Sequence, residues 1–213
     1  YAYISDGGIQ EEISQGAGRI AGHLGLDNLV MFYDANNIQL STTVEEVDTE
    51  DVAAKYQAWG WHVLHVDGSN PEEIRKALQQ AKATVGKPTL IIGKTIMGRG
   101  AVTADGSSFE NKVSTHGQPI SAAGASIEET IKHLGGDPEN PFRIFPEVEA
   151  LYAERLAELR ALAKARKQEE STWRAENKER ANKLDRWFSG VAPQVDWSKV
   201  VQKPNQATRA ASA

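Results

Sequence analysis

Two side chains that offer oxygen ligands, Asp6 and Asn36, lie about 30 residues apart, which is the length of one βαβ unit. In an open parallel sheet, this spacing brings both side chains to the same carboxyl edge, where ligands bind. A carboxylate, an amide oxygen and a nearby main-chain carbonyl suit a hard divalent cation such as Mg2+, which keeps its other octahedral positions for phosphate oxygens and water. The pair therefore predicts a metal-bridged diphosphate site.

The elements around this pair favour a site over a simple turn, although an isolated Asp-Gly dipeptide is usually only a turn. Residues 1–4 form a β-prone run, and residues 28–33 form a nearly unbroken apolar run, as expected for a strand covered on both faces. Between them, the apolar spacing predicts a helix over residues 9–24 that ends at Gly25. Both candidate ligands are therefore expected just past strand ends.

Strands and helices continue to alternate further along the chain. The pattern predicts a helix over residues 50–58, a strand over 61–66, a helix that begins at Pro71 and a strand over 88–93. Four β-like runs that alternate with helical ones favour an α/β fold with a doubly wound parallel sheet.

The stretch from residue 98 to 124 is rich in Gly, Ser, Thr and Ala and contains His116. Long irregular segments of compact domains are commonly functional. From side-chain chemistry alone, a core histidine and a functional histidine are equally supported at this position. Lys94 ends the strand before this stretch, where a cation near phosphates and a solvated lysine are equally compatible with the sequence.

The pattern changes at Pro146, where apolar residues fall on one helical face and charged residues fill the other. From Asn177 the periodicity is lost, which predicts a polar connector. The chain is therefore expected to contain a domain over residues 1–145 and a helical and extended linker over residues 146–213.

Composition restricts the class of protein. With 213 residues, 40% hydrophobic and 25% charged, the chain can bury a core and is neither disordered nor membrane-spanning by composition. A formal net charge of −5 gives no reason to expect nucleic acid as a partner. The lack of Cys excludes disulfides and thiolate metal sites and permits a cytoplasmic location. No apolar stretch of membrane length and no signal peptide appears, so no membrane partner is expected.

Six segments, in this order, resemble the transketolase family of thiamine-diphosphate enzymes, and the resemblance runs from residue 1 to the end of the chain. These segments are Asp6-Gly7 with Glu11; Ile20-Ala21-Gly22-His23-Leu24-Gly25-Leu26; Tyr33-Asp34-Ala35-Asn36-Asn37-Ile38; Tyr56-Gln57-Ala58-Trp59-Gly60-Trp61-His62-Val63; Lys94-Thr95-Ile96-Met97-Gly98; and Ser114-Thr115-His116-Gly117-Gln118-Pro119.

This resemblance implies a set of cofactor ligands. Asp6 and Asn36 would bind Mg2+ (or Ca2+) through their side chains, and Ile38 would bind it through its carbonyl oxygen. Gly7 and Gly8 would leave room for the diphosphate of thiamine diphosphate.

The resemblance also implies a catalytic residue and a subunit contact. His116 would contact the diphosphate and the reacting substrate, and Glu11 would belong to the glutamate network that couples the subunits of a homodimer. The family usually has Gly where Ser5 and Glu12 stand here. Serine keeps the turn if its φ is negative, and a negative charge is favourable in a first helical turn.

By this resemblance, the chain belongs to an enzyme of the pentose phosphate pathway that moves a two-carbon ketol unit between sugar phosphates. It opens without Met, and its last residues resemble the opening of a second domain. We therefore expect part of a longer polypeptide, in which a missing pyrimidine-binding domain carries the glutamate that activates the cofactor. The chain alone is expected to be inactive.

Three alternatives are kept. Deoxyxylulose-phosphate synthase and the dehydrogenase decarboxylases share an Asp-Gly plus Asn site, but residues 56–63 and 114–119 favour transketolase. A non-catalytic subunit that binds cofactor and partner is a second alternative. A Rossmann dinucleotide site is the third, and the absence of Gly-x-Gly-x-x-Gly counts against it.

Overall fold

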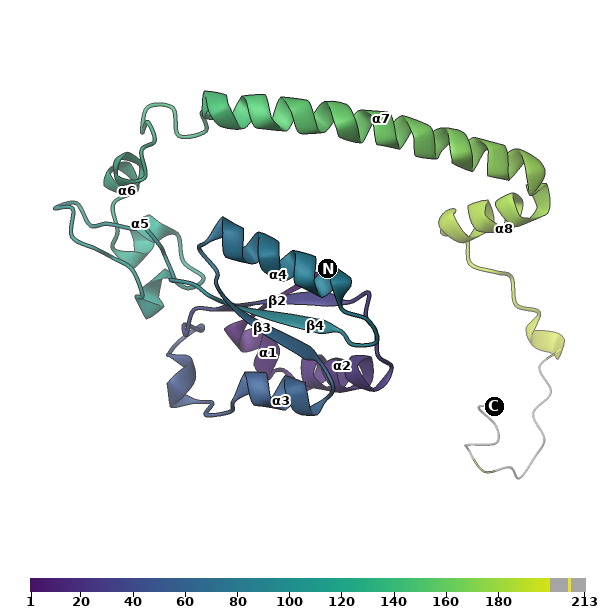
Figure 1. Cartoon of the computed structure of the whole chain (residues 1–213), viewed down its shortest axis with the longest axis horizontal. Coiled ribbons are helices and arrows are strands. Elements are labelled where there is room, and N and C mark those ends of the chain that lie inside the picture. The colour runs from purple at the N-terminus through teal and green to yellow at the C-terminus, as the bar shows by residue number, and fades with distance from the viewer. Residues whose placement is uncertain (200–206, 208–213) are drawn as a thin grey trace. The chain divides into compact units, whose positions relative to one another are not determined.

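The computed structural model describes residues 1–199 and Ala207, and it divides into two compact units, Tyr1–Arg143 and Ile144–Ala213 (Figure 1). The first unit contains the sheet and every candidate site residue. The second unit is helical. Within the described part of the chain, no helix is both long enough and apolar enough to cross a membrane.

The sheet has four parallel strands in the order β1-β2-β4-β3. The strands are β1 (Ala2–Ser5), β2 (Val30–Ala35), β3 (His62–Asp67) and β4 (Thr89–Lys94). All four predicted strands are present, each shifted by about one or two residues, which is the usual uncertainty of element boundaries. Because Ser5 pairs with Asp34, the chain leaves β1 and β2 at the same level of the sheet, as the spacing of Asp6 and Asn36 predicted.

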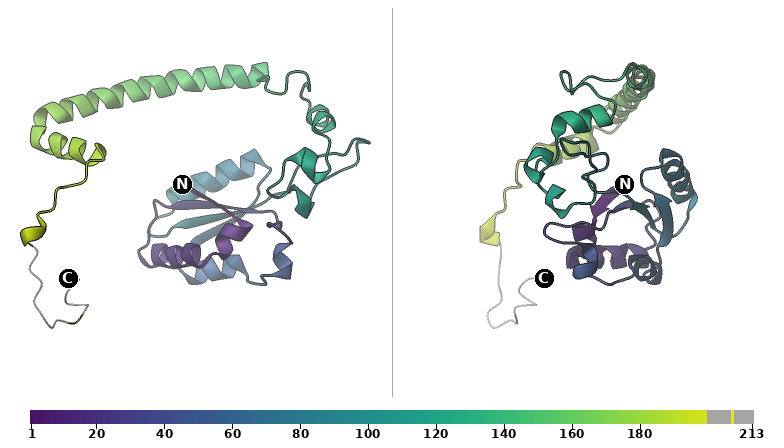
Figure 2. Two further views of the ribbon diagram at one scale, coloured as in Figure 1. Left: turned by 180° about the vertical axis from the view of Figure 1, so that it is seen from behind. Right: turned by 90° about the vertical axis from the view of Figure 1, so that its left-hand side faces the viewer.

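Helices cover both faces of this sheet, which confirms the doubly wound α/β fold (Figures 1 and 2). One face carries α1 (Asp6–Gln10), α2 (Glu12–His23) and α3 (Val52–Ala58), and the other carries α4 (Pro71–Ala83). Adjacent strand residues point to opposite faces, so Leu90 belongs to the core under α1 to α3, whereas Ile91 belongs to the core under α4.

The helix predicted over residues 9–24 is broken at Glu11, whose backbone is extended (φ −64°, ψ 131°). Gly25 ends α2 in the left-handed conformation, as predicted. The apolar spacing does not mark the buried face, because Ile13 and Ile20 are 87% and 59% exposed, whereas Gly18 and Ala21 are buried.

Aromatic side chains explain why α2 presents small residues to the core. A Cβ added at Gly18 would lie 3.2 Å from the Tyr56 ring, and the Trp61 indole N–H donates to the Gly18 carbonyl at 2.7 Å. Because these rings lie directly against α2, only small residues fit on that side of the helix, and the larger Ile13 and Ile20 are exposed.

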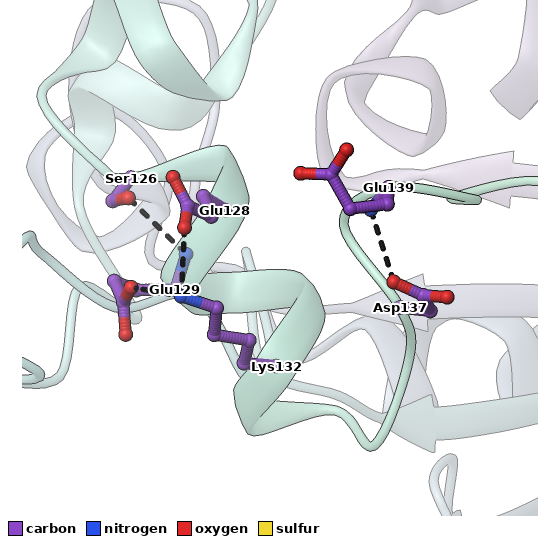
Figure 3. Close-up of polar contacts among 6 residues, drawn as sticks. All are labelled: Ser126, Glu128, Glu129, Lys132, Asp137 and Glu139. Atoms are coloured by element: carbon purple, nitrogen blue, oxygen red, sulfur yellow. Dashed lines mark hydrogen bonds and ion pairs between the residues drawn. The ribbon is translucent and has the colours of Figure 1, made fainter.

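The Gly-rich stretch after β4 is anchored by the short helix α6 (Ile127–His133). The buried Thr130 hydroxyl accepts the Val102 N–H at 3.1 Å. Figure 3 shows Ser126 accepting the Glu129 N–H and thereby capping the helix, and Lys132 between Glu128 and Glu129. Exposed ion pairs of this kind contribute little to stability, so the buried Thr130 contact is the stronger tie.

The remaining short elements of the first unit are η1 (Val44–Glu46), η2 (Val113–Thr115) and α5 (Ile120–Ala123).

In the second unit, the helix predicted from Pro146 is present as α7 (Pro146–Glu176). The predicted connector from Asn177 is wrong over its first part, because residues Lys178–Phe188 form the helix α8. An ion pair from Arg174 to Asp185 at 2.8 Å and the buried Ala181 stabilise this helix, a tertiary contact that the mostly charged sequence conceals. The connector predicted over residues 200–206 and 208–213 lies outside the described residues.

Gly22 tests the packing of α2. A Cβ at Gly22 would lie 1.9 Å from the Trp59 carbonyl oxygen, a backbone atom that cannot move aside cheaply. Gly22→Ala should therefore destabilise the fold by about 1–3 kcal/mol or more in urea denaturation. Gly16→Ala in the same helix is the control, since nothing lies within 4 Å of its added Cβ, and it should stabilise by about 0.5–1 kcal/mol. Equal stability of the two variants would contradict this packing.

Candidate functional site

A cleft of about 1110 Å³ opens at the carboxyl ends of β2, β3 and β4. This is the edge where open α/β sheets bind ligands. Charged and polar side chains from each of these strands and from the Gly-rich stretch line it, among them Asp6, Tyr33, His65, Asp67, Lys94, Arg99 and Glu110. The cleft combines carboxylates with cations.

Asp6 lies at this edge directly after β1 and is 2% exposed. Its Oδ1 accepts the Tyr33 hydroxyl at 2.6 Å, and its Oδ2 accepts the backbone N–H groups of Asn36 and Asn37, both at 3.1 Å. Two successive N–H groups therefore converge on one oxygen, and the backbone of Asn37 itself is left-handed (φ 67°). Asn tolerates this conformation better than most residues.

The Asp6 carboxylate has no basic partner among the described residues. Burial raises its pKa, and the neighbouring charge of Asp34 raises it further, whereas the bonds from Tyr33, Asn36 and Asn37 oppose this. Burial and the nearby Asp6 also raise the pKa of Tyr33 well above its usual value, so its hydroxyl remains a donor. A buried carboxylate without a cation favours a bound metal ion as the missing partner.

Asn36 lies next to Asp6 through its backbone N–H, whereas neither Asn36 nor Ile38 is among the residues that line the cleft. Asn36 Oδ1 accepts the Ile38 N–H at 3.0 Å and so retains one lone pair. The Ile38 carbonyl accepts no hydrogen bond from the described residues, although Ile38 is buried. These oxygens match the ligands that a hard divalent cation prefers.

No group of three or more His, Cys, Asp or Glu side chains in the described part of the chain could hold a metal ion. A metal here would therefore depend on amide and carbonyl oxygens in addition to a single carboxylate.

The two glycines after Asp6 have different surroundings. Gly7 is exposed, and nothing lies within 4 Å of a Cβ added there, so space for a ligand is available. At Gly8 an added Cβ would lie 3.0 Å from Ile4 Cγ1, so packing also limits this position. Ser5 has a negative φ of −100° and caps α1 by accepting the Gly8 N–H, so it is compatible with the turn.

His116 is half-buried at the end of η2, and its Nδ1 has no hydrogen-bond partner. It is not among the residues that line the cleft, and no hydrogen bond joins it to Asp6 or Asn36 in the described residues. A Cβ added at the next residue, Gly117, would lie 3.6 Å from Leu40, so this loop adjoins the segment that follows Ile38.

Glu11, which belongs to the family signature, and Glu12, which stands where the family usually has Gly, are both exposed. Glu11 lies between α1 and α2, and Glu12 lies in the first turn of α2, where its charge is favourable.

Two residues that hold Asp6 were missed by sequence reasoning, namely Tyr33 and Asn37. In the sequence, Tyr33 looked like an ordinary residue of an apolar strand. In the structure it is 6% exposed and packs in the core. The only signal was its place at the end of a strand, directly before the segment that carries Asn36. Asn37 carried the signal of a residue that tolerates positive φ.

The family of the chain follows from comparison with known proteins. A family described as transketolase, thiamine diphosphate binding domain, matches residues 1–193. A transketolase of Streptococcus pyogenes is 33% identical over 100% of this chain and 28% of its own length. The structure of a Leishmania mexicana transketolase matches with a TM-score of 0.77 and 28% identity, over 94% of this chain and 29% of that one.

A transketolase structure from Pichia stipitis, in complex with sedoheptulose-7-phosphate, matches with a TM-score of 0.75 and 30% identity, over 96% of this chain and 30% of that one. The chain therefore spans less than a third of the length of the relatives that it matches.

The raised pKa of Asp6 predicts a dependence of stability on pH in the metal-free chain. Burial of Asp6 favours its protonated form in the folded state. Ionisation of Asp6 therefore lowers the free energy of unfolding as the pH rises above the ordinary pKa of 3.8, and the full loss is present above the raised pKa. Asp6→Asn should therefore increase the free energy of unfolding at pH 7, and this gain should shrink as pH falls toward 3.8. Urea denaturation between pH 4 and 8 measures it, with the exposed Glu45→Gln as control. A loss of stability at pH 7 would contradict the prediction.

Proposed function

Because the chain belongs to the transketolase family, we propose that it supplies the diphosphate and Mg2+ half of a transketolase active site. The observation that carries this proposal is the buried Asp6 carboxylate, which has no basic partner among the described residues and accepts the backbone N–H of Asn36. When bound, thiamine diphosphate supplies the electron sink for the transfer of a two-carbon ketol unit. The chain's own residues bind and orient it.

The ligands have separate tasks in this proposal. Asp6 Oδ1, Asn36 Oδ1 and the Ile38 carbonyl each retain a lone pair for Mg2+. Gly7 leaves space for the diphosphate, and Lys94 places a cation in the cleft that Asp6 also lines. The charge of the metal ion offsets the repulsion between Asp6 and the phosphates.

Sugar phosphates are the proposed substrates, since a structure of the Pichia stipitis relative contains sedoheptulose-7-phosphate. His116 is the proposed catalytic residue, as a hydrogen-bonding or proton-transferring partner of the substrate oxygen. Its unpartnered Nδ1 supports this role, because a buried ring nitrogen without a partner is available to a ligand.

The other half of the site would come from a pyrimidine-binding domain, with residues 146–213 as the linker toward it. We propose a cytoplasmic homodimer in which Glu11 lies at the subunit contact. The exposed apolar residues of the neighbouring α2, Ile13, Ile20 and Leu24, support this contact. The chain alone would lack the aminopyrimidine contacts and so would be inactive.

Replacing Asp6 tests the metal assignment. In a complete transketolase that contains this chain, Asp6→Ala should abolish binding of thiamine diphosphate in the presence of Mg2+, because the phosphate charge loses its metal bridge. Asn36→Ala should weaken binding less, since it removes a neutral ligand. Isothermal titration calorimetry measures both variants. Unchanged affinity in Asp6→Ala would disprove the metal assignment.

Replacing His116 tests its proposed role in turnover. His116→Ala should lower kcat by about 10²-fold or more with little loss of melting temperature, because general acid–base groups contribute about 10²–10⁴-fold. Steady-state kinetics with xylulose 5-phosphate and ribose 5-phosphate, together with thermal melts, separate the two effects. A large drop in melting temperature with normal specific activity would instead identify His116 as a packing residue.

A further inference from the structure

Three basic side chains line the cleft on the side of β3 and β4, and none of them is a proposed metal ligand. They are His65 on β3, Lys94 at the end of β4 and Arg99 in the turn that follows. We propose that these residues form a second anion site, which binds a phosphate group separate from the diphosphate of a cofactor at Asp6. This site goes beyond the proposed function and does not depend on it.

The acidic and basic groups of the cleft are not paired with one another. Each of its five carboxylates accepts at least one hydrogen bond from the chain, and these carboxylates are Asp6, Glu45, Asp67, Glu73 and Glu110. The side chains of His65, Lys94 and Arg99 form no hydrogen bond or ion pair with the described residues. These three basic groups are therefore available to an anionic ligand.

The pairing of β3 with β4 places two of the basic residues on one face of the sheet. The strands are parallel, with His65 opposite Ile92 and Asp67 opposite Lys94. Because alternate residues of a strand share a face, His65 and Lys94 lie on the same face, with Cα atoms about 8 Å apart by ordinary strand spacing. One phosphate group fits between two long side chains at this separation.

Arg99 is presented by a turn that is anchored on both sides. It lies between Gly98 and Gly100, whose backbones are both left-handed (φ 64° and 79°). The buried Gly100 donates its N–H to the Glu110 carboxylate at 2.7 Å. A Cβ added at Gly100 would lie 2.5 Å from Leu134, so the turn packs closely on the residue that ends α6. An anchored turn lowers the entropy that is lost when Arg99 binds a ligand.

The order of the strands separates this group from Asp6. In the order β1-β2-β4-β3, three strand spacings lie between β1, which Asp6 follows directly, and β3. With about 4.8 Å between neighbouring strands, the carboxyl ends of β1 and β3 are roughly 14 Å apart. A diphosphate bound at Asp6 through a metal ion is too short to reach His65 as well. The cleft, at about 1110 Å³, has room for both anions.

A phosphate group matches these side chains better than a carboxylate does. The planar guanidinium of Arg99 binds two oxygens of a phosphate at once, whereas Lys94 contributes a compact charge. A phosphate ester offers three acceptor oxygens and nearly two negative charges, but a carboxylate offers two oxygens and one charge. Three basic groups therefore match one phosphate both in the number of acceptors and in charge.

The test is the binding of inorganic phosphate to a complete transketolase that contains this chain, saturated with thiamine diphosphate and Mg2+ so that the diphosphate site is filled. In calorimetry at low salt, Arg99→Ala should lower the phosphate affinity by about 10-fold or more, because hydrogen bonds between charged groups are lost. His65→Ala should also lower it. Arg75→Ala is the matched control and should leave it unchanged, because Arg75 is exposed on α4, pairs with Glu72 and does not line the cleft.

A second titration, with ribose 5-phosphate, identifies the source of the phosphate group. If Arg99→Ala also lowers the affinity for ribose 5-phosphate, and inorganic phosphate competes with this sugar phosphate in the unmodified protein, the site takes the phosphate of a substrate. If the affinity for ribose 5-phosphate is unchanged while that for inorganic phosphate falls, the site takes the free phosphate ion. Both results support the site.

Two results would overturn it. If phosphate binds only in the absence of thiamine diphosphate and Mg2+, or not at all, the basic residues form no separate site. If Arg99→Ala binds phosphate as tightly as Arg75→Ala does, Arg99 has no part in binding. If the protein does not bind the cofactor, only the proposed function fails, and the same two variants are then compared in the cofactor-free protein.

Discussion

The structure of the site depends on one costly group, the buried carboxylate of Asp6. Its oxygens accept one hydroxyl and two backbone N–H groups, yet burial still raises its pKa, so the hydrogen bonds do not fully offset the loss of water. All three donors come from β2 or from the two residues that follow it. The pairing of β1 with β2 therefore positions the carboxylate and its donors together.

This cost is consistent with a binding site, because groups that bind a ligand are often poorly satisfied in its absence. The Ile38 carbonyl and the His116 Nδ1 also lack partners in the described residues. Each is placed by an element that is itself well anchored: Ile38 is 5% exposed, and the Gly-rich stretch is tied to α6 through Thr130. Buried hydroxyls without a partner also occur in the core, at Tyr56 and Thr89, so the lack of a partner alone does not mark a binding site.

Packing on the face beneath α1 to α3 explains a second feature of the chain. The rings of Tyr56, Trp59 and Trp61 lie against α2, which contacts this segment through Gly18 and Gly22. The larger apolar residues of α2 are left exposed. An apolar helix face that the core does not need is available for a contact with another chain.

The strands and most helices could be predicted from the sequence, because apolar period, Pro71 and Gly25 are local signals. Asp6 and Asn36 could be predicted as neighbours because parallel strands place successive carboxyl ends together. The local sequence could not show the break at Glu11, the buried face of α2 or the helix α8, since each depends on contacts with distant side chains.

The sequence by itself determined the α/β class, the approximate strand ends and the residue types of the proposed metal site, because these follow from local periodicity and side-chain chemistry. Only the tertiary structure decided which oxygen of Asp6 is available, because that depends on the Tyr33 hydroxyl and on the backbone N–H groups of Asn36 and Asn37. It also decided that His116 lies outside the set of residues lining the cleft, because the path of the Gly-rich stretch is set by its contacts with α6.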